Sequence, residues 1–280
     1  MVQVASSAGA PALAVTDMAV SFGGVRALAG VSVEVRPHEI VGIIGPNGAG
    51  KTTLFDGITG HLACSGRVFL GGTELTTMGP HQRAAAGLGR SYQDARLYPS
   101  MTVRDTLRTA TELTIRANGW QAKVPGTTTS RRAERAAVAA ADEMIDLMGL
   151  SAYAGKFIRE LSTGTRRVVD LGSLLIQQPT VILFDEPSSG IAQREAEALG
   201  PLIGRIREQT GAAILVIEHD MPLLMGISDR LYALETGAVV LSGAPEDVVR
   251  DPRVIASYLG DDLAAINRSG TTSVMSDVVV

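Results

Sequence analysis

The run Gly45-Pro46-Asn47-Gly48-Ala49-Gly50-Lys51-Thr52 has the residue types and the spacing of a loop that binds phosphate. Glycines let backbone N–H groups turn toward phosphate oxygens, and a following helix directs its positive end at them. In this pattern Lys51 neutralises the β- and γ-phosphates and the Thr52 hydroxyl can ligate Mg²⁺. We assign Thr53, the next residue, to the same site. An ordinary Gly-rich turn is the alternative, but it does not require the apolar strand before the run or the helical pattern after it.

Two acids follow an apolar run at Val181–Phe184, which is typical of a buried strand. A doubly wound sheet opens to its ligand at the ends of such strands. Asp185 is therefore placed to hold Mg²⁺, and Glu186 can point elsewhere and polarise a water for in-line attack. By themselves, paired acids at this position are equally compatible with a solvated strand end. The phosphate loop upstream favours the functional interpretation.

His219 follows another apolar run, Ala212–Ile217, so it could reach the same phosphate. The flanking acids Glu218 and Asp220 suggest a metal site. However, no second His or Cys lies at ligand spacing, and we do not expect His219 to bind metal.

Ser162 precedes a helical pattern that continues through Val168–Ile176. Its hydroxyl could cap that helix, and Gly164 would leave backbone N–H groups open to an anion. A simple N-cap explains this stretch equally well when it is taken alone.

The pattern around these residues predicts a parallel α/β core. Period-two alternation over residues 13–36, interrupted by Gly23-Gly24, indicates a pair of half-buried antiparallel strands. A second strand pair surrounds Gly71-Gly72. Further strands are expected at Ile40–Ile44, Val181–Phe184, Ala212–Ile217, Leu231–Leu234 and Val239–Leu241. A helix is expected at Arg194–Gln209. Together they predict a parallel sheet that carries an antiparallel layer.

A helical insertion is expected near residues 94–159. Val103–Ala117 and Arg131–Met148 have helical patterns, and the polar stretch Asn118–Ser130 between them is expected to be a loop. The two ends of the chain lack periodicity, so residues 1–12 and 261–280 are predicted to be flexible.

Composition limits the classes of protein to which the chain can belong. Its 280 residues carry a net charge of −4, with 45% apolar and 19% charged residues, which excludes a disordered chain and disfavours a nucleic-acid binder. The single Cys64 excludes an internal disulfide. No secretory signal or membrane-spanning run is present, so we expect a cytoplasmic protein that reaches a membrane only through a partner.

Together these motifs resemble the nucleotide-binding subunits of ATP-binding cassette (ABC) transporters over residues 13–260. The resemblance implies a P-loop NTPase (RecA-like) core at 13–93 and 160–260, with a helical subdomain at 94–159. It implies ATP and Mg²⁺ as ligands and a head-to-tail dimer that encloses two ATP molecules.

The resemblance also implies a role for each site residue. Phe22 stacks on adenine, and the loop Gly45–Thr52 holds the phosphates. Ser162 and Gly164 bind the γ-phosphate held by the opposite subunit. The remaining roles are those of the metal ligand Asp185, the catalytic base Glu186, the γ-phosphate sensor His219, and Gln93, which meets Mg²⁺, the attacking water and the membrane subunit.

A narrower resemblance links the stretches 90–99, 218–230 and 243–260 to the ATPases of branched-chain amino-acid importers. The implied partners are membrane-spanning permease subunits, a second ATP-binding subunit that is identical or different, and a solute-binding protein, with no nucleic acid. The chain would then lie on the cytoplasmic face of the membrane. The segment 96–101, with its proline and apolar side chains, would dock on the permease, although these side chains could instead pack as local core.

Three alternatives remain at this point. An ABC exporter or lipid-transport ATPase is the nearest one. Soluble ABC ATPases of DNA repair or ribosomes carry long insertions or two cassettes, which this chain lacks. A non-hydrolysing regulatory module would lack Glu186 or His219, and both are present.

The sequence departs from the family pattern at two positions. Thr165 follows the signature glycine where glutamine or a similar polar residue is usual. Ala192 ends the loop after the catalytic acid where Asp or Asn is usual. The second departure puts the cross-talk between the two ATP sites in doubt, but neither removes a phosphate or metal ligand.

Overall fold

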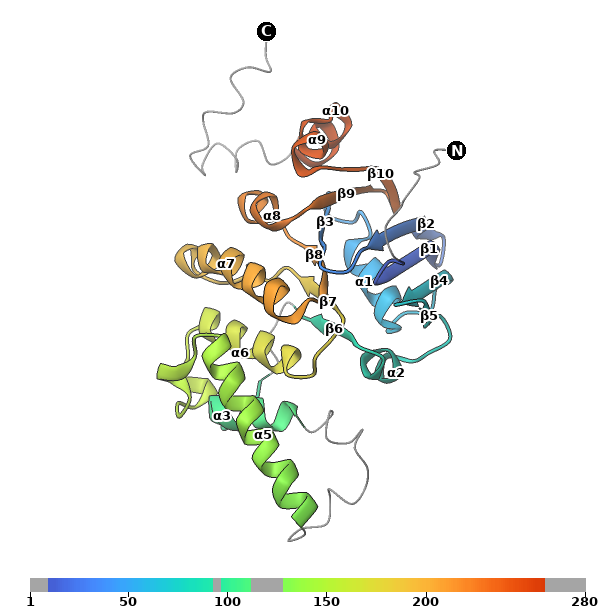
Figure 1. Ribbon diagram of the computed structural model, residues 1–280. Coiled ribbons are helices and arrows are strands. Elements are labelled where there is room, and N and C mark those ends of the chain that lie inside the picture. Colours follow the sequence, from blue (N-terminus) through green and yellow to red (C-terminus); the bar gives the residue numbers. More distant parts are fainter. Residues whose placement is uncertain (1–9, 93–96, 112–127, 260–280) are drawn as a thin grey trace.

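The computed structural model describes residues 10–92, 97–111 and 128–259, and two β-sheets organise it (Figure 1). The larger sheet has the order β10-β9-β3-β8-β7-β6. Its strands are β3 (Ile40–Ile44), β6 (Leu88–Ser91), β7 (Val181–Asp185), β8 (Ala213–Ile217), β9 (Arg230–Glu235) and β10 (Ala238–Gly243). The smaller sheet has the order β2-β1-β4-β5, from β1 (Leu13–Phe22), β2 (Val25–Val35), β4 (Ser65–Leu70) and β5 (Thr73–Glu74).

Parallel pairing in the larger sheet brings distant segments to one edge. Strand β3 is parallel to β8 and β9, and β7 is parallel to β8 and β6. Ile43 pairs with Ile217, and Asp185 pairs with that same Ile217 from the other side. The residues that follow β3, β7 and β8 therefore start at the same level of the sheet.

Both faces of this sheet are buried, which explains its continuous apolar runs. Alternate side chains enter two different cores: Ile182 and Phe184 lie in the core on the helical side, whereas Val181 and Leu183 lie in the core on the other side. All four are fully buried.

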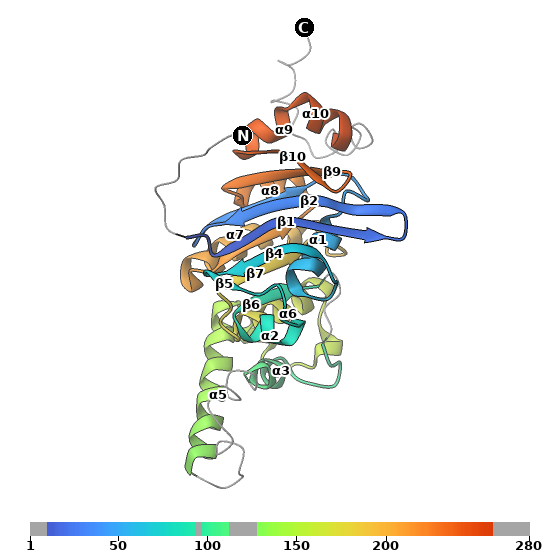
Figure 2. The same ribbon diagram turned by 90° about the vertical axis from the view of Figure 1, so that its right-hand side faces the viewer.

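The smaller sheet and helix α1 (Lys51–Thr59) cover one face of the larger sheet (Figures 1 and 2). Leu54, Phe55 and Ile58 of α1 enter this core with no exposed surface. A Cβ at Gly57 would lie 2.6 Å from the sulfur of Met18, so glycine lets α1 pack closely on β1.

Helices cover the opposite face, and one of them connects the core to the helical region. That helix is α6 (Thr163–Leu175), against which α3 (Val103–Ala110) and α5 (Thr128–Leu147) pack. A Cβ at Gly172 of α6 would lie 3.2 Å from Leu107 of α3 and 3.4 Å from Met144 of α5. The other helices are α2 (Pro80–Ala85), α7 (Gln193–Thr210), α8 (Met221–Ile227), α9 (Pro245–Arg250) and α10 (Pro252–Val254), with short helical turns η2 (Ser151–Tyr153), η3 (Ile158–Glu160) and η4 (Ile255–Leu259).

The predicted α/β class with an antiparallel layer is confirmed, and the differences concern helix limits and short elements. The helix expected over Val103–Ala117 ends at Ala110 in the structure, with Thr111 as its C-cap, and residues 112–127 are outside the described part. Helix α5 begins at Thr128, inside the expected loop. Strand β6 and helices α2 and α8 were not predicted, because four to seven residues give too little periodicity. None of the helices in the described ranges could span a bilayer.

Asp170 on α6 is a half-buried residue whose carboxyl group has a shifted pKa. Burial raises the pKa of Asp170 from 3.8 to about 6, and the nearby Arg167 guanidinium opposes this shift only in part. The folded state then binds the Asp170 proton more tightly than the unfolded state, so folding loses stability as the pH rises from 4 to 6.

We predict that Asp170→Asn removes this loss. The gain in unfolding free energy over the parent protein should be near zero at pH 4 and on the order of 2–3 kcal/mol at pH 7.5. Denaturant unfolding at a series of pH values measures it, with Glu143→Gln on the exposed side of α5 as control. A gain that does not depend on pH would contradict the prediction.

Candidate active site

The phosphate loop lies between two segments of backbone that leave no room for side chains. Gly45 has φ 154°, and a Cβ there would lie 2.2 Å from the Leu234 carbonyl oxygen. Gly50 has φ 100°, and its Cβ would lie 2.6 Å from the Ala27 carbonyl oxygen. Both positions therefore require glycine. The loop is further fixed by the Gly237 N–H, which donates to the Ala49 carbonyl at 3.0 Å.

Lys51 folds back over this loop. Its Nζ donates to the carbonyl oxygens of Gly45 at 2.6 Å and Pro46 at 3.1 Å. Burial lowers the pKa of Lys51, while the negative charges of Glu186 and Asp185 act to raise it. The ammonium group is thus held over the loop and lies within electrostatic reach of both acids.

The open side of the loop faces solvent. Asn47, Gly48 and Thr52 are exposed, whereas Pro46 and Thr53 are half-buried. Phe22, at the end of β1, keeps 52% of its surface exposed. The loop and the start of α1 could therefore receive a triphosphate, and Phe22 offers an uncovered aromatic ring for a base.

Asp185 and Glu186 lie at the carboxyl end of β7, as predicted. Asp185 is only 7% exposed. Glu186 has φ 48°, a left-handed conformation that costs a non-glycine residue about 1–3 kcal/mol. Its N–H donates to the Ile217 carbonyl of β8 at 2.9 Å, which helps to hold this conformation. Strain of this kind is concentrated at functional sites.

The structure brings Glu186 together with His219. His219 Nε2 lies 3.0 Å from Glu186 Oε1. The buried carboxylate of the neighbouring Glu218 accepts the N–H groups of Ser188 and His219, each at 2.7 Å. From the sequence, Glu218 is predicted only as an acid that flanks His219. It directly follows an apolar strand, however, and a carboxylate that is buried at such a position needs backbone N–H donors.

A divalent cation fits this edge of the sheet only with help from a substrate. Within residues 10–92, 97–111 and 128–259, no three His, Cys, Asp or Glu side chains form a group that could hold a metal. Mg²⁺ commonly takes one or two protein oxygens, with the rest from water and substrate phosphates. The Thr52 hydroxyl and the Asp185 carboxylate are oxygen ligands of that kind. Gln93, the other predicted metal contact, lies outside the described residues.

Ser162 and Gly164 lie together at the start of α6, and both contact Glu195 of α7. Ser162 is the N-cap, and its Oγ accepts the Thr165 N–H at 3.1 Å and donates to Glu195 Oε1 at 2.7 Å. A Cβ at Gly164 would lie 2.3 Å from the same carboxylate. An acidic side chain therefore covers the place where the motif predicts an anion. Glu195 cannot be recognised from the sequence, because nothing in its helical spacing distinguishes it from other surface acids.

The two departures from the family pattern have local structural consequences. The Thr165 hydroxyl lies 2.9 Å from Ser162 Oγ, so it keeps a polar group beside the cap. Ala192 is the N-cap of α7 and provides no side-chain hydrogen bond there. An Asp or Asn cap would stabilise a helix start by about 1 kcal/mol.

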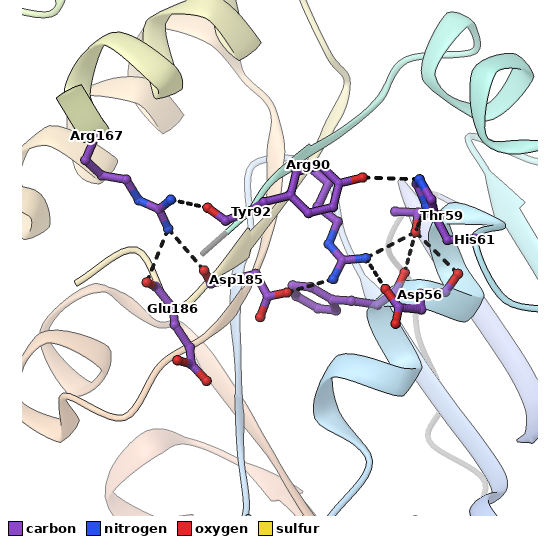
Figure 3. Close-up of polar contacts among 9 residues, drawn as sticks. Asp56, Thr59, His61, Arg90, Tyr92, Arg167, Asp185 and Glu186 are labelled. Atoms are coloured by element: carbon purple, nitrogen blue, oxygen red, sulfur yellow. Dashed lines mark hydrogen bonds and ion pairs between the residues drawn. The ribbon is translucent and has the colours of Figure 1, made fainter. Parts of the chain in front are cut away.

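Two arginines with buried side chains also lie at this edge, Arg90 on β6 and Arg167 on α6 (Figure 3), and neither has a role predicted from the sequence. Arg167 donates to the carbonyl oxygens of Asp185 at 3.1 Å, Glu186 at 3.2 Å and also Tyr92. It thereby joins the helix that begins at Ser162 to the strand end that carries both acids. The feature of the sequence that could have identified these two arginines is a charged residue within an otherwise apolar strand or helix face.

Comparison with known proteins agrees with this geometry. The chain matches the ABC transporter family over residues 28–189 and the branched-chain amino acid ATP-binding cassette transporter family over residues 238–264. It is 36% identical over 252 residues to LivG of Salmonella typhimurium, a high-affinity branched-chain amino acid transport ATP-binding protein, covering 90% of this chain and 98% of that protein. BraF of Pseudomonas aeruginosa, with the same description, is 34% identical over 90% of this chain and 98% of its own length.

The fold also matches solved structures. The crystal structure of the ADP conformation of MJ1267, an ATP-binding cassette of an ABC transporter, superposes with a TM-score of 0.77 and 28% identity, covering 90% of this chain and 100% of that chain. The predicted family, fold class and nucleotide-binding activity are confirmed. The chain therefore belongs to the ATP-binding subunits of ABC transporters and is an ATPase coupled to transport.

Proposed function

We propose that this chain is the ATPase subunit of an importer for branched-chain amino acids or a similar small solute. The observation that carries the proposal is the match of residues 238–264 to the branched-chain amino acid cassette family, a region outside the general ATPase motifs. The full-length similarity to LivG and BraF supports it. An exporter remains the competing function, since LptB of Haemophilus influenzae, a lipopolysaccharide export ATP-binding protein, is 30% identical over 89% of this chain.

In this proposal, ATP is hydrolysed at the edge formed by the phosphate loop and the ends of β7 and β8. Lys51 and the loop N–H groups hold the β- and γ-phosphates, and Phe22 supports the adenine. Thr52, Asp185 and Gln93 would ligate Mg²⁺, which neutralises charge on the phosphates. Glu186 accepts a proton from the attacking water. The water oxygen bonds to the γ-phosphorus, and the bond between the γ-phosphorus and ADP breaks. His219 lies 3.0 Å from Glu186 and would orient the carboxylate and contact the γ-phosphate.

Glu186→Gln should abolish turnover and keep ATP binding. The amide keeps the size of the side chain but cannot accept the proton, and loss of a general base lowers rates by about 10²- to 10⁴-fold. Steady-state phosphate release and binding of a labelled ATP measure the two effects. Lys51→Ala is the comparison, because it should weaken ATP binding instead. Hydrolysis at the parent rate by Glu186→Gln would show that another group is the base.

We also propose that Ser162 and Gly164 act on ATP held by a second ATP-binding subunit in a head-to-tail dimer. Glu195 then has a consequence for assembly, since its carboxylate lies 2.7 Å from Ser162 Oγ, where the γ-phosphate of the partner's ATP would bind. Two negative groups in one site repel each other, so Glu195 must move before the dimer closes.

Glu195→Gln should therefore strengthen ATP-driven dimerisation. With Glu186→Gln as background to prevent hydrolysis, we expect the dimer dissociation constant to fall by about tenfold, equivalent to 1.4 kcal/mol. Sedimentation velocity in ATP measures it. Glu197→Gln, an exposed acid on the same helix, is the matched control. Gly164→Asp should prevent dimerisation without lowering monomer ATP affinity. Unchanged or weaker dimerisation in Glu195→Gln would count against the repulsion.

We propose that permease subunits dock on the surface around Tyr98, which would hold this chain on the cytoplasmic face of the membrane. Tyr98 is 69% exposed and Phe157 is 37% exposed. Backbone hydrogen bonds join their two segments, from Ile158 to Met101 at 2.9 Å and from Arg159 to Pro99 at 3.2 Å. Leu97, in contrast, packs against the core, so only part of segment 96–101 fits the local-core alternative. Residues 94–159 would move as a helical unit that transmits ATP binding to this surface.

Reconstituted vesicles test both the cargo and the docking surface. The complete complex with its solute-binding protein should take up a branched-chain amino acid in an ATP-dependent manner. Tyr98→Glu should abolish uptake and permease association, while the ATPase rate and thermal midpoint of the isolated subunit stay unchanged, because the side chain is exposed. Val25→Glu, at an exposed apolar residue of β2, is the control and should keep association. ATP-dependent lipid export without amino-acid uptake would refute the importer.

A further inference from the structure

Arg90 is a buried charge with an unusual set of neighbours (Figure 3). It lies on β6, the edge strand of the larger sheet, and pairs in register with Leu183 of β7. Its side chain is only 5% exposed. A buried guanidinium is costly unless its donors are used, so its partners indicate why it is there.

Two carboxylates from different elements share this guanidinium. One terminal nitrogen donates to Asp185 Oδ2 at 2.7 Å, and the other donates to Asp56 Oδ1 at 2.6 Å. Asp185 ends β7 and is itself almost buried, whereas Asp56 belongs to α1 and is 37% exposed at its side chain. Arg90 therefore connects the helix that follows the phosphate loop to the acid at the strand end.

Aromatic rings and a further hydroxyl group also lie close to the guanidinium. Its central carbon lies 4.9 Å from the centre of the Tyr92 ring and 5.6 Å from that of Phe55. The Tyr92 hydroxyl is in turn 3.3 Å from His61 Nε2, and His61 Nδ1 is 2.9 Å from Thr59 Oγ1. The second terminal nitrogen also reaches that Thr59 hydroxyl at 3.3 Å. Two aromatic rings and three oxygen acceptors therefore surround the guanidinium.

We propose that Arg90 is a positioning residue that sets the orientation of the Asp185 carboxylate for Mg²⁺ bound with ATP. One carboxylate oxygen is occupied by Arg90, so the group cannot rotate freely and its second oxygen keeps one direction. Asp56 serves as the anchor that holds the guanidinium in place. The inference rests on the proposed metal role of Asp185 and extends it to two residues that do not touch the metal.

In this arrangement the positive charge of Arg90 should weaken Mg²⁺ binding, whereas its geometry should favour it. The two effects can therefore be separated. A positive group beside Asp185 weakens the attraction of the carboxylate for a cation, so charge alone gives Arg90 no favourable role in metal binding. A planar guanidinium can hold two carboxylates at once, whereas a lysine ammonium is a flexible point charge. Arg90→Lys therefore keeps the charge and loses the geometry.

The measurement is the gain in ATP affinity that Mg²⁺ provides, in the Glu186→Gln background and at protein concentrations that keep the chain monomeric. A fluorescent ATP analogue is titrated once with EDTA and once with excess Mg²⁺. We expect Arg90→Lys to bind the analogue as well as the parent in EDTA and to lose about tenfold or more of the Mg²⁺ gain. Loss of a group that orients a metal ligand typically has an effect of this size.

Asp56 offers a matched pair of variants at a half-exposed position, where folding is not at risk. Asp56→Asn loses the charge and keeps an oxygen acceptor for Arg90, so it should retain the Mg²⁺ gain. Asp56→Ala loses both and should lower the gain. Arg67→Lys, at an exposed arginine paired with Glu74, is the control for an Arg-to-Lys change and should alter nothing.

An unchanged Mg²⁺ gain in Arg90→Lys would overturn the proposal, and so would equal losses in Asp56→Asn and Asp56→Ala. Equal weakening in EDTA and in Mg²⁺ would also contradict it, because that pattern indicates a structural role only. If the thermal midpoint shows that Arg90→Lys does not fold, the comparison of Asp56→Asn with Asp56→Ala tests the proposal instead. Asp185→Asn is measured beside them. If it keeps the full Mg²⁺ gain, the proposed metal role of Asp185 is what fails.

Discussion

Parallel hydrogen bonding among β3, β7 and β8 is the constraint on which the rest of this structure depends. It places the segments after these three strands at one edge of the sheet, although the phosphate loop and His219 are far apart in sequence. The proposed chemistry of the site depends on this pairing, since it requires a helix start, two acids and a histidine to meet the same triphosphate. Burial on both faces then fixes the register, because a shift of one residue would exchange the two cores.

A second level of organisation comes from charges that the fold buries around this edge. Arg167 binds carbonyl oxygens at the end of β7, Arg90 binds Asp185 and Asp56, and Glu218 binds the N–H groups of Ser188 and His219. Each buried charge is matched by groups from another element, which is the condition for keeping it out of water. The same contacts connect the phosphate loop helix, the strand end and the start of α6, so they join the parts of the molecule that must respond to ATP.

The positions expected from sequence agree with the structure where the pattern consists of consecutive residues. The loop Gly45–Thr52, the acids after β7 and the N-cap Ser162 are short local patterns, and the structure places them at strand and helix ends as expected. The limits of α3 and the short elements β6, α2 and α8 were not predictable, because their few residues carry no period of their own and form by packing against longer neighbours.

The sequence by itself determined the family, the parallel α/β class and the residues of the phosphate loop, because glycine conformations and apolar periodicity act over a few neighbouring residues. Only the tertiary structure decided which polar and charged side chains meet. Arg90 lies 34 residues from Asp56 and 95 from Asp185, and Glu195 lies 33 residues from Ser162. No local pattern encodes such distances. These pairs are set by the order of strands in the sheet and by the packing of α1, α6 and α7 on its two faces. For Arg90, the free energy of burying a charge also requires that acids lie within its reach.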